Sequence, residues 1–127
     1  MNASAVQLKM MIVDDSNIMR RRIERSQQIE RLEVVGSAAN GREAVDLFQR
    51  TRPDVVTMDL TMPEMDGIQC VEQLVKLNPD VLILVISALA DKATAVEAIE
   101  RGANGFLCKP FTDRQLNYAL EELLSAL

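Results

Sequence analysis

Polar residues with complementary chemistry follow several of the apolar runs in this chain of 127 residues. They are three carboxylates, a hydroxyl and an ammonium, at Asp14, Asp15, Asp59, Ser87 and Lys109. Three carboxylates brought together repel one another, which raises one or more of their pKa values unless a cation lies among them. A ligand set of oxygens alone favours Mg²⁺, which binds carboxylates together with water and phosphate oxygens. Opposite such an ion, the hydroxyl and the ammonium could hold the other oxygens of a phosphoryl group.

Five apolar runs, each followed by a helical pattern, would position these residues. The predicted strands cover residues 8–13, 32–36, 55–58, 81–86 and 105–108, and the predicted helices follow at about 17–30, 41–50, 67–77, 91–101 and 113–124. The first and fourth strands are apolar on both faces, which is typical of central strands in a parallel sheet that helices cover on both sides. The pattern predicts one open, doubly wound α/β domain with a five-stranded parallel sheet, five helices and right-handed crossovers.

The predicted fold would bring the polar residues to one edge of the sheet. In open α/β sheets, ligands bind outside the carboxyl ends of the strands, at the point where the strand order reverses. Taken singly, each residue has a plainer interpretation, because an Asp after a strand usually caps the next helix and a Lys there is usually solvated. Their joint placement after strand ends favours a binding site.

Local signals support several helix boundaries. Asn40 with Glu43, and Thr112 with Gln115, have the spacing of N-terminal capping boxes, and Gly102 stands where a helix would end in a left-handed residue. The last helix carries an apolar stripe that we expect to be buried, at Leu116, Ala119, Leu120, Leu123, Leu124 and Leu127.

The first predicted helix has a weaker pattern. After Ile23 the next turn offers Ser26, Gln27 and Gln28 where apolar residues are expected, so the helix either packs loosely or ends early. The arginine run at 20–22 is interpreted as a solvated face, with steering of an acidic partner as the alternative.

Composition excludes several classes of protein. The chain has no histidine, which rules out Ser/His/Asp and Cys/His catalysts and most transition-metal sites. Its 14 Lys and Arg against 19 Asp and Glu give a net charge of -5, which argues against nucleic acid as a partner. The longest apolar run is too short to span a bilayer and the N-terminus lacks a leader pattern, so we expect a cytoplasmic protein without a membrane contact. Cys70 and Cys108 are predicted to be small buried residues rather than a disulfide.

Four segments carry motifs, at 11–16 (MIVDDS), 58–67 (MDLTMPEMDG), 87–88 (SA) and 102–111 (GANGFLCKPF). In combination they resemble the receiver (CheY-like) domain of bacterial two-component response regulators. The similarity runs from about residue 8 to residue 124, so we expect residues 1–127 to be a single receiver domain with no effector domain in this chain. The resemblance implies the flavodoxin-like strand order 2-1-3-4-5.

The resemblance also implies a role for each site residue. Asp59 matches the phosphoryl acceptor, and Asp14 and Asp15 match the acidic pair that helps to hold Mg²⁺. Thr61 matches the position whose backbone carbonyl completes the protein ligands of the metal. Such a site transfers a phosphoryl group by positioning it and neutralising its charge.

The remaining matches are residues that, by the same resemblance, respond to the bound phosphoryl group. Ser87 matches the hydroxyl residue that turns toward the phosphoryl group, and Lys109 matches the cation that pairs with it. Pro110 matches a site where the family commonly has a cis peptide bond. Phe106 matches the aromatic switch residue, but many relatives carry Tyr there, and Phe has no hydroxyl with which to bond at the surface. A plain core aromatic is the alternative for Phe106.

The resemblance implies partners as well. The phosphoryl group would come from a sensor histidine kinase or a histidine phosphotransfer protein. A downstream protein would read the surface formed by the fourth helix, the fifth strand and the fifth helix, and the chain would be a monomer or a phosphorylation-dependent dimer. It would not be an enzyme beyond catalysing its own phosphorylation and dephosphorylation.

Three classes remain as hypotheses: a signalling switch that stands alone or is part of a longer regulator, an aspartyl-phosphate phosphatase, and a flavodoxin-like electron carrier. Such phosphatases often carry a second carboxylate two residues after the nucleophile, where this chain has Thr61. An electron carrier would need a loop that cradles phosphate after the first strand, whereas Asp14 and Asp15 would repel one. The switch is therefore the preferred hypothesis.

Overall fold

The computed structural model describes residues 7–62, 65–88 and 92–127. Five parallel strands form one sheet in the order β2-β1-β3-β4-β5, as predicted. The strands are β1 (Leu8–Val13), β2 (Leu32–Ala38), β3 (Val55–Met58), β4 (Leu82–Ser87) and β5 (Gly105–Cys108). The helices are α1 (Asn17–Ser26), α2 (Gly41–Thr51), α3 (Gly67–Leu77), α4 (Lys92–Glu100) and α5 (Asp113–Leu124).

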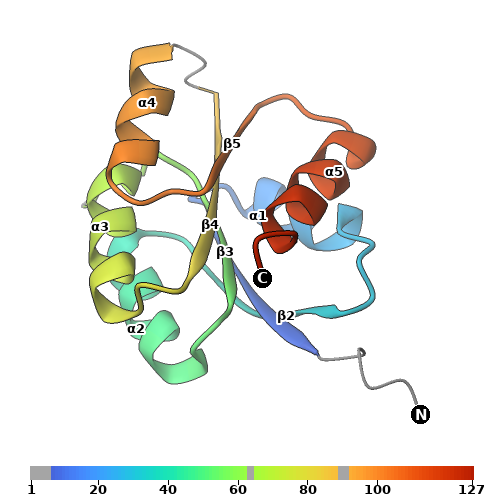
Figure 1. Ribbon diagram of the computed structural model, residues 1–127, viewed down its shortest axis with the longest axis horizontal. Helices are drawn as coiled ribbons and strands as arrows, with labels where there is room; N and C mark the ends of the chain where they lie inside the picture. Colours follow the sequence, from blue (N-terminus) through green and yellow to red (C-terminus); the bar gives the residue numbers. More distant parts are fainter. Residues whose placement is uncertain (1–6, 63–64, 89–91) are drawn as a thin grey trace.

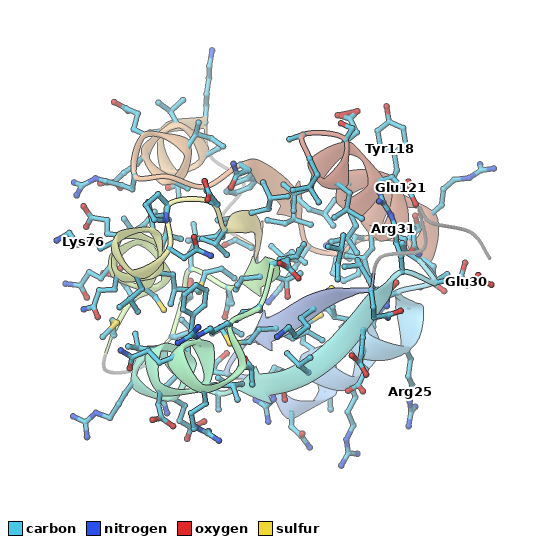
Figure 2. The ribbon with its side chains drawn as sticks, turned by 60° about the horizontal axis from the view of Figure 1, so that its bottom comes forward. Arg25, Glu30, Arg31, Lys76, Tyr118 and Glu121 are labelled. Atoms are coloured by element: carbon cyan, nitrogen blue, oxygen red, sulfur yellow. The ribbon has the colours of Figure 1, made fainter. Side chains whose placement is uncertain are left out.

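Helices cover both faces of the sheet, with α1 and α5 on one side and α2, α3 and α4 on the other (Figure 1). Each side has its own apolar core: Ile23, Leu116 and Leu120 belong to the first, and Phe48 and Leu74 to the second. Charged side chains such as those of Arg25, Lys76 and Glu121 lie outside these layers (Figure 2). None of the helices in the described ranges is long and apolar enough to cross a membrane.

The register of the strands brings their carboxyl ends level. Val13 at the end of β1 pairs with Met58 at the end of β3, and the amide of Asp59 donates to the carbonyl of Val13 at 2.9 Å. At the ends of the neighbouring pair β4 and β5, the amide of Lys109 donates to the carbonyl of Ser87, also at 2.9 Å. The residues that follow these strands therefore start from the same edge of the sheet.

The second strand is longer than predicted and ends at Ala38. Its last residues pair with the end of β1, after a register shift between Met10 and Met11, and the amide of Asp14 donates to the carbonyl of Ala38. The irregularity breaks the simple alternation of side chains along β2, because an extra residue shifts the face on which those after it lie. The strand predicted from the alternation of apolar residues therefore ended at residue 36, two residues before the observed end of β2.

The first helix ends at Ser26, so its predicted extent to residue 30 is wrong and the early end is confirmed. The polar residues after it bond to the chain instead of continuing the helix. The side chain of Gln27 accepts from the amide of Ile29 and donates to the carbonyl of Leu32, and the amide of Gln28 donates to Asn117 on α5. These bonds hold the segment together with Ile29, which packs against the core on this side of the sheet.

Helix-end signals were mostly correct. Thr112 and Gln115 form a capping box, and Gly102 has a φ of 121°, which favours glycine. Asn40 caps α2, but the side chain of Glu43 accepts from the amide of Ala39 rather than from that of Asn40, so this box is incomplete. The predicted start of the fourth helix at Asp91 lies outside the described residues.

Two burial predictions at the sheet edge and the C-terminus are wrong. Cys108 is exposed, because β5 is an edge strand, whereas Cys70 is buried as predicted. Leu127 lies beyond α5 and is 67% exposed, although four leucines of the same stripe are buried. The stripe therefore ends with the helix.

Candidate functional site

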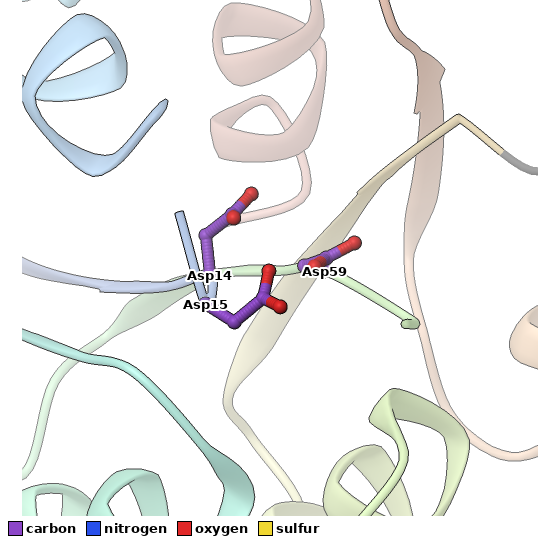
Figure 3. Close-up of side chains that lie close together, drawn as sticks. All are labelled: Asp14, Asp15 and Asp59. Atoms are coloured by element: carbon purple, nitrogen blue, oxygen red, sulfur yellow. The ribbon is translucent and has the colours of Figure 1, made fainter. Parts of the chain in front are cut away.

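The three predicted carboxylates converge at the carboxyl edge of the sheet. Asp14 and Asp15 follow β1, Asp59 follows β3, and one oxygen from each lies within 4.8 Å of the other two (Figure 3). Asp14 and Asp59 are buried, with 1% and 5% of their surface exposed, whereas Asp15 is exposed. The cluster is thus closed on the protein side and open toward solvent at Asp15.

The environment of Asp59 opposes its charge. Burial, followed by the negative charge of Asp14, raises the pKa of Asp59 from 3.8 to about 6, against the opposing effects of Lys109 and the backbone amide of Thr61. The positive charge of Lys109 therefore does not fully offset the burial and the repulsion that oppose the charge of Asp59. Three hard oxygen donors within reach of one another suit Mg²⁺, so the residues present fit the predicted ion.

The side chain of Lys109 contacts two of the three carboxylates, those of Asp14 and Asp59. Its Nζ is 2.7 Å from Oδ2 of Asp14 and 3.6 Å from Oδ1 of Asp59, and its side chain is 18% exposed. The peptide bond between Lys109 and Pro110 is cis, as the resemblance implied. The loop between β5 and α5 therefore presents one ammonium to two of the three carboxylates.

The other predicted residues lie at the same edge. Ser87 is fully buried at the end of β4, and its carbonyl accepts from the amide of Lys109. The backbone amide of Thr61 donates to Oδ1 of Asp59 at 3.4 Å. The roles of the Thr61 carbonyl as a ligand and of the Ser87 hydroxyl as a phosphoryl contact stay predictions.

This arrangement can be compared with known proteins. A family model described as the response regulator receiver domain matches residues 10–121. The chain belongs to this family. The relatives of this receiver domain include the chemotaxis protein CheY of Thermotoga maritima, 41% identical over 91% of this chain and 96% of its own length.

Longer relatives and solved structures agree. A protein-glutamate methylesterase/protein-glutamine glutaminase of Alkalilimnicola ehrlichii is 40% identical over 96% of this chain, which spans 33% of that protein. The structure of the CheX-CheY-BeF3-Mg+2 complex from Borrelia burgdorferi aligns with a TM-score of 0.89 and 27% identity, over 94% of this chain and 90% of that one. Both single-domain and longer proteins thus resemble this receiver domain.

The aromatic residue on β5 is partly buried in this receiver domain. Phe106 packs against the core under α2, α3 and α4, and it also borders a pocket of about 530 Å³ between β5 and α5, with Leu107 and Tyr118. Partial exposure is compatible with either a packed or an exposed rotamer. Its role as a switch stays a prediction.

One further site residue has no counterpart among the predicted roles. A Cβ atom on Gly67 would lie 2.3 Å from the carbonyl oxygen of Asp59 and 2.4 Å from Cα of Leu60. The amide of Gly67 donates to the carbonyl of Leu60, so α3 begins directly against the segment that carries Asp59. The sequence could have indicated this role, because a glycine directly after the N-cap Asp66 is typical of a position where two backbone segments approach closely.

The interpretation of the arginine run at 20–22 on α1 as a solvated face is wrong for two of its three residues. The guanidinium of Arg20 donates to the backbone carbonyl of Asp14 at 2.7 Å, and that of Arg22 donates to the carbonyl of Phe111. Arg21 alone of the three is exposed. Spacing could not reveal these bonds, because their acceptors are backbone carbonyls outside the helix.

Proposed function

We propose that this receiver domain accepts a phosphoryl group on Asp59 in a Mg²⁺-dependent reaction and thereby switches a protein-binding surface. The observation that carries the proposal is the placement of Asp59, buried between Asp14 and Lys109 at the edge where the strand order reverses. The raised pKa of about 6 still leaves Asp59 mostly ionised near pH 7. The carboxylate is then available as a nucleophile.

The proposed donor is a phosphohistidine, which lies outside these 127 residues because they contain no histidine. An oxygen of the Asp59 carboxylate attacks the phosphorus, the bond from phosphorus to the imidazole nitrogen breaks, and that nitrogen keeps the electron pair and takes up a proton. Hydrolysis reverses the state, because water attacks the phosphorus and the carboxylate leaves. A sensor histidine kinase or a histidine phosphotransfer protein provides such a donor.

Residues around Asp59 stabilise the transferred group. Bound to Asp14, Asp15, Asp59 and the Thr61 carbonyl, Mg²⁺ would supply positive charge to the phosphoryl oxygens. Lys109 gives a second cation, since its Nζ lies 3.6 Å from Asp59 before any phosphoryl group is present. Ser87 donates a hydrogen bond from the neighbouring strand end.

The output surface consists of α4, β5 and α5, and it binds a downstream protein in the cytoplasm. Phe106 and the weakly anchored α4, in which Ala98 is the buried residue, would change position together. Chemotaxis is a setting that the CheY relatives support. We expect no turnover of phosphate monoesters by this chain, because no carboxylate occupies the position of Thr61.

Intact-mass spectrometry after incubation with acetyl phosphate tests the proposal. Wild type with Mg²⁺ should gain a single phosphoryl group, and chelation of Mg²⁺ should prevent the gain. Asp59→Asn should abolish labelling, whereas Asp80→Asn, the same change at an exposed carboxylate, should leave it intact. Labelling that persists in Asp59→Asn would refute the assignment of the acceptor.

A further inference from the structure

A charged side chain of α1 holds the loop that carries Lys109. The guanidinium of Arg22 donates through Nη2 to the carbonyl of Phe111, and its Cζ lies 4.6 Å from the centroid of the Phe111 ring. A hydrogen bond from a charged donor and a cation over an aromatic face are each favourable in a partly buried position. Arg22 is partly buried and Phe111 is 3% exposed.

Phe111, which Arg22 holds, lies two residues after Lys109, whose ammonium contacts Asp14 and Asp59. Lys109 is held on one side by its backbone amide, which donates to Ser87, and on the other side the chain continues through Pro110 to Phe111. Arg22 fixes that second end to α1. The backbone of Lys109 is therefore held between β4 and α1.

The same helix also holds the acidic pair. Arg20, two residues before Arg22, donates to the backbone carbonyl of Asp14 at 2.7 Å. One helix thus contacts both the segment with Asp14 and the loop with Lys109. Between these two supported segments, Lys109 Nζ lies 2.7 Å from Asp14 and 3.6 Å from Asp59.

We propose that Arg22 is a positioning residue for phosphoryl transfer, which acts by fixing the Lys109 loop relative to Asp14 and Asp59. The proposal rests on the proposed function of Asp59 as the acceptor. Small displacements of a positioned group lower the rate of transfer steeply, by up to about a hundredfold for 1 Å. Arg22 touches no reacting atom, so its effect must pass through Lys109.

Loss of Arg22 should leave the fold intact. The side chain of Asn117 on α5 donates to the carbonyl of Ser26 at 2.8 Å and accepts from the amide of Gln28 at 2.8 Å, so α1 and α5 stay joined without Arg22. The Phe111 ring belongs to the apolar core on this side of the sheet. The substitution therefore changes how the loop is held rather than whether it folds.

The test measures phosphorylation of Asp59 by acetyl phosphate with Mg²⁺ as a function of donor concentration. The variants are Arg22→Ala, Arg22→Lys, Lys109→Ala and the double variant of Arg22→Ala with Lys109→Ala. Arg21→Ala is the matched control, because Arg21 is an exposed arginine on the same helix. Mg²⁺ affinity is measured by calorimetry, since the chain has no tryptophan to report binding.

We expect Arg22→Ala to lower the maximal rate by about tenfold. The donor concentration at half-maximal rate and the Mg²⁺ affinity should both stay within about twofold, with Arg22→Lys intermediate and Arg21→Ala at the wild-type rate. The double variant should match Lys109→Ala, because a residue that acts through Lys109 has no effect once Lys109 is gone.

Two results would overturn the inference while leaving the acceptor intact: an unchanged maximal rate in Arg22→Ala, or rate losses that multiply in the double variant. A wild-type protein that is not phosphorylated at all would instead refute the proposed function, so the two failures are distinguishable.

Discussion

The two helices on either side of β5 are anchored very differently. Four leucines of α5 are buried, whereas α4 buries Ala98 and leaves Val96 and Ile99 exposed at 46% and 47%. The polar ties differ as well. Asn117 on α5 donates to the carbonyl of Ser26 at the end of α1 in a partly buried position, while Arg101 beyond α4 bonds to Glu72 at the exposed surface.

This contrast separates two mechanical roles. The α1 and α5 side carries the supports of Asp14 and Lys109, so it must hold the site at fixed distances. The helix α4 itself buries little apolar surface, and elements with few buried apolar contacts open at a low cost in free energy. A site held firmly beside a weakly anchored helix suits a switch whose output side moves.

Core truncation gives the largest expected difference between the two helices. Leu120→Ala on α5 should lower the free energy of unfolding by about 3 kcal/mol, because Leu120 is fully buried. Val96→Ala on α4 should change it by less than about 0.5 kcal/mol. Urea denaturation of both variants checks this, and equal losses would contradict the contrast between the helices.

The acid cluster gives the next largest effect. Without Mg²⁺, Asp59→Asn should raise the free energy of unfolding by about 2 kcal/mol near pH 7, because it removes a carboxylate whose pKa is raised to about 6. Between about pH 4 and pH 6 Asp59 keeps a proton in the folded chain that it has released in the unfolded chain, so its contribution to the free energy of unfolding falls as the pH rises through this window.

The gain from Asp59→Asn should therefore be small near pH 4 and complete above about pH 6. Thermal melts across this range, without metal and then with Mg²⁺, measure it. Addition of Mg²⁺ should stabilise wild type more than Asp59→Asn. A gain that is the same at every pH would mean that the charge of Asp59 is not its cause.

The smallest effect concerns a buried hydroxyl beside the site. Oγ1 of Thr57 on β3 is buried and has no hydrogen-bond partner among the described residues. Thr57→Val keeps the shape and removes the unpaired group, so it should raise the free energy of unfolding by about 1 kcal/mol. Chemical denaturation tests this, and a loss of stability would show that the hydroxyl is bonded.

Much of the fold could be predicted because strand and helix periods are local. The runs at β1 and β4 indicated central strands, and the strand order and the cis Lys109–Pro110 bond followed from the resemblance of the motifs. The end of β2 could not be predicted, because it depends on pairing with β1 across a register shift. Cys108 was misplaced because the apolar run around it was interpreted as a buried strand, although the implied strand order already put this strand at an edge of the sheet.

For the site too, local patterns could be predicted and contacts that depend on tertiary packing could not. Asp14, Asp15 and Asp59 could be predicted to meet, since residues after parallel strands share an edge. The supports of the site could not, because Arg20 and Arg22 bond to backbone carbonyls that depend on the tertiary packing of α1. A run of arginines on a helix looks the same whether it is solvated or bonded.

Mapping the modified residue tests the central claim most directly. After incubation with acetyl phosphate and Mg²⁺, borohydride reduction of an acyl phosphate expels the phosphate and converts the aspartate to homoserine, which peptide mass spectrometry can locate. The account predicts homoserine at position 59 and unmodified Asp14 and Asp15. Homoserine at either of those two positions, or a phosphoryl group that yields no homoserine at position 59, would contradict it.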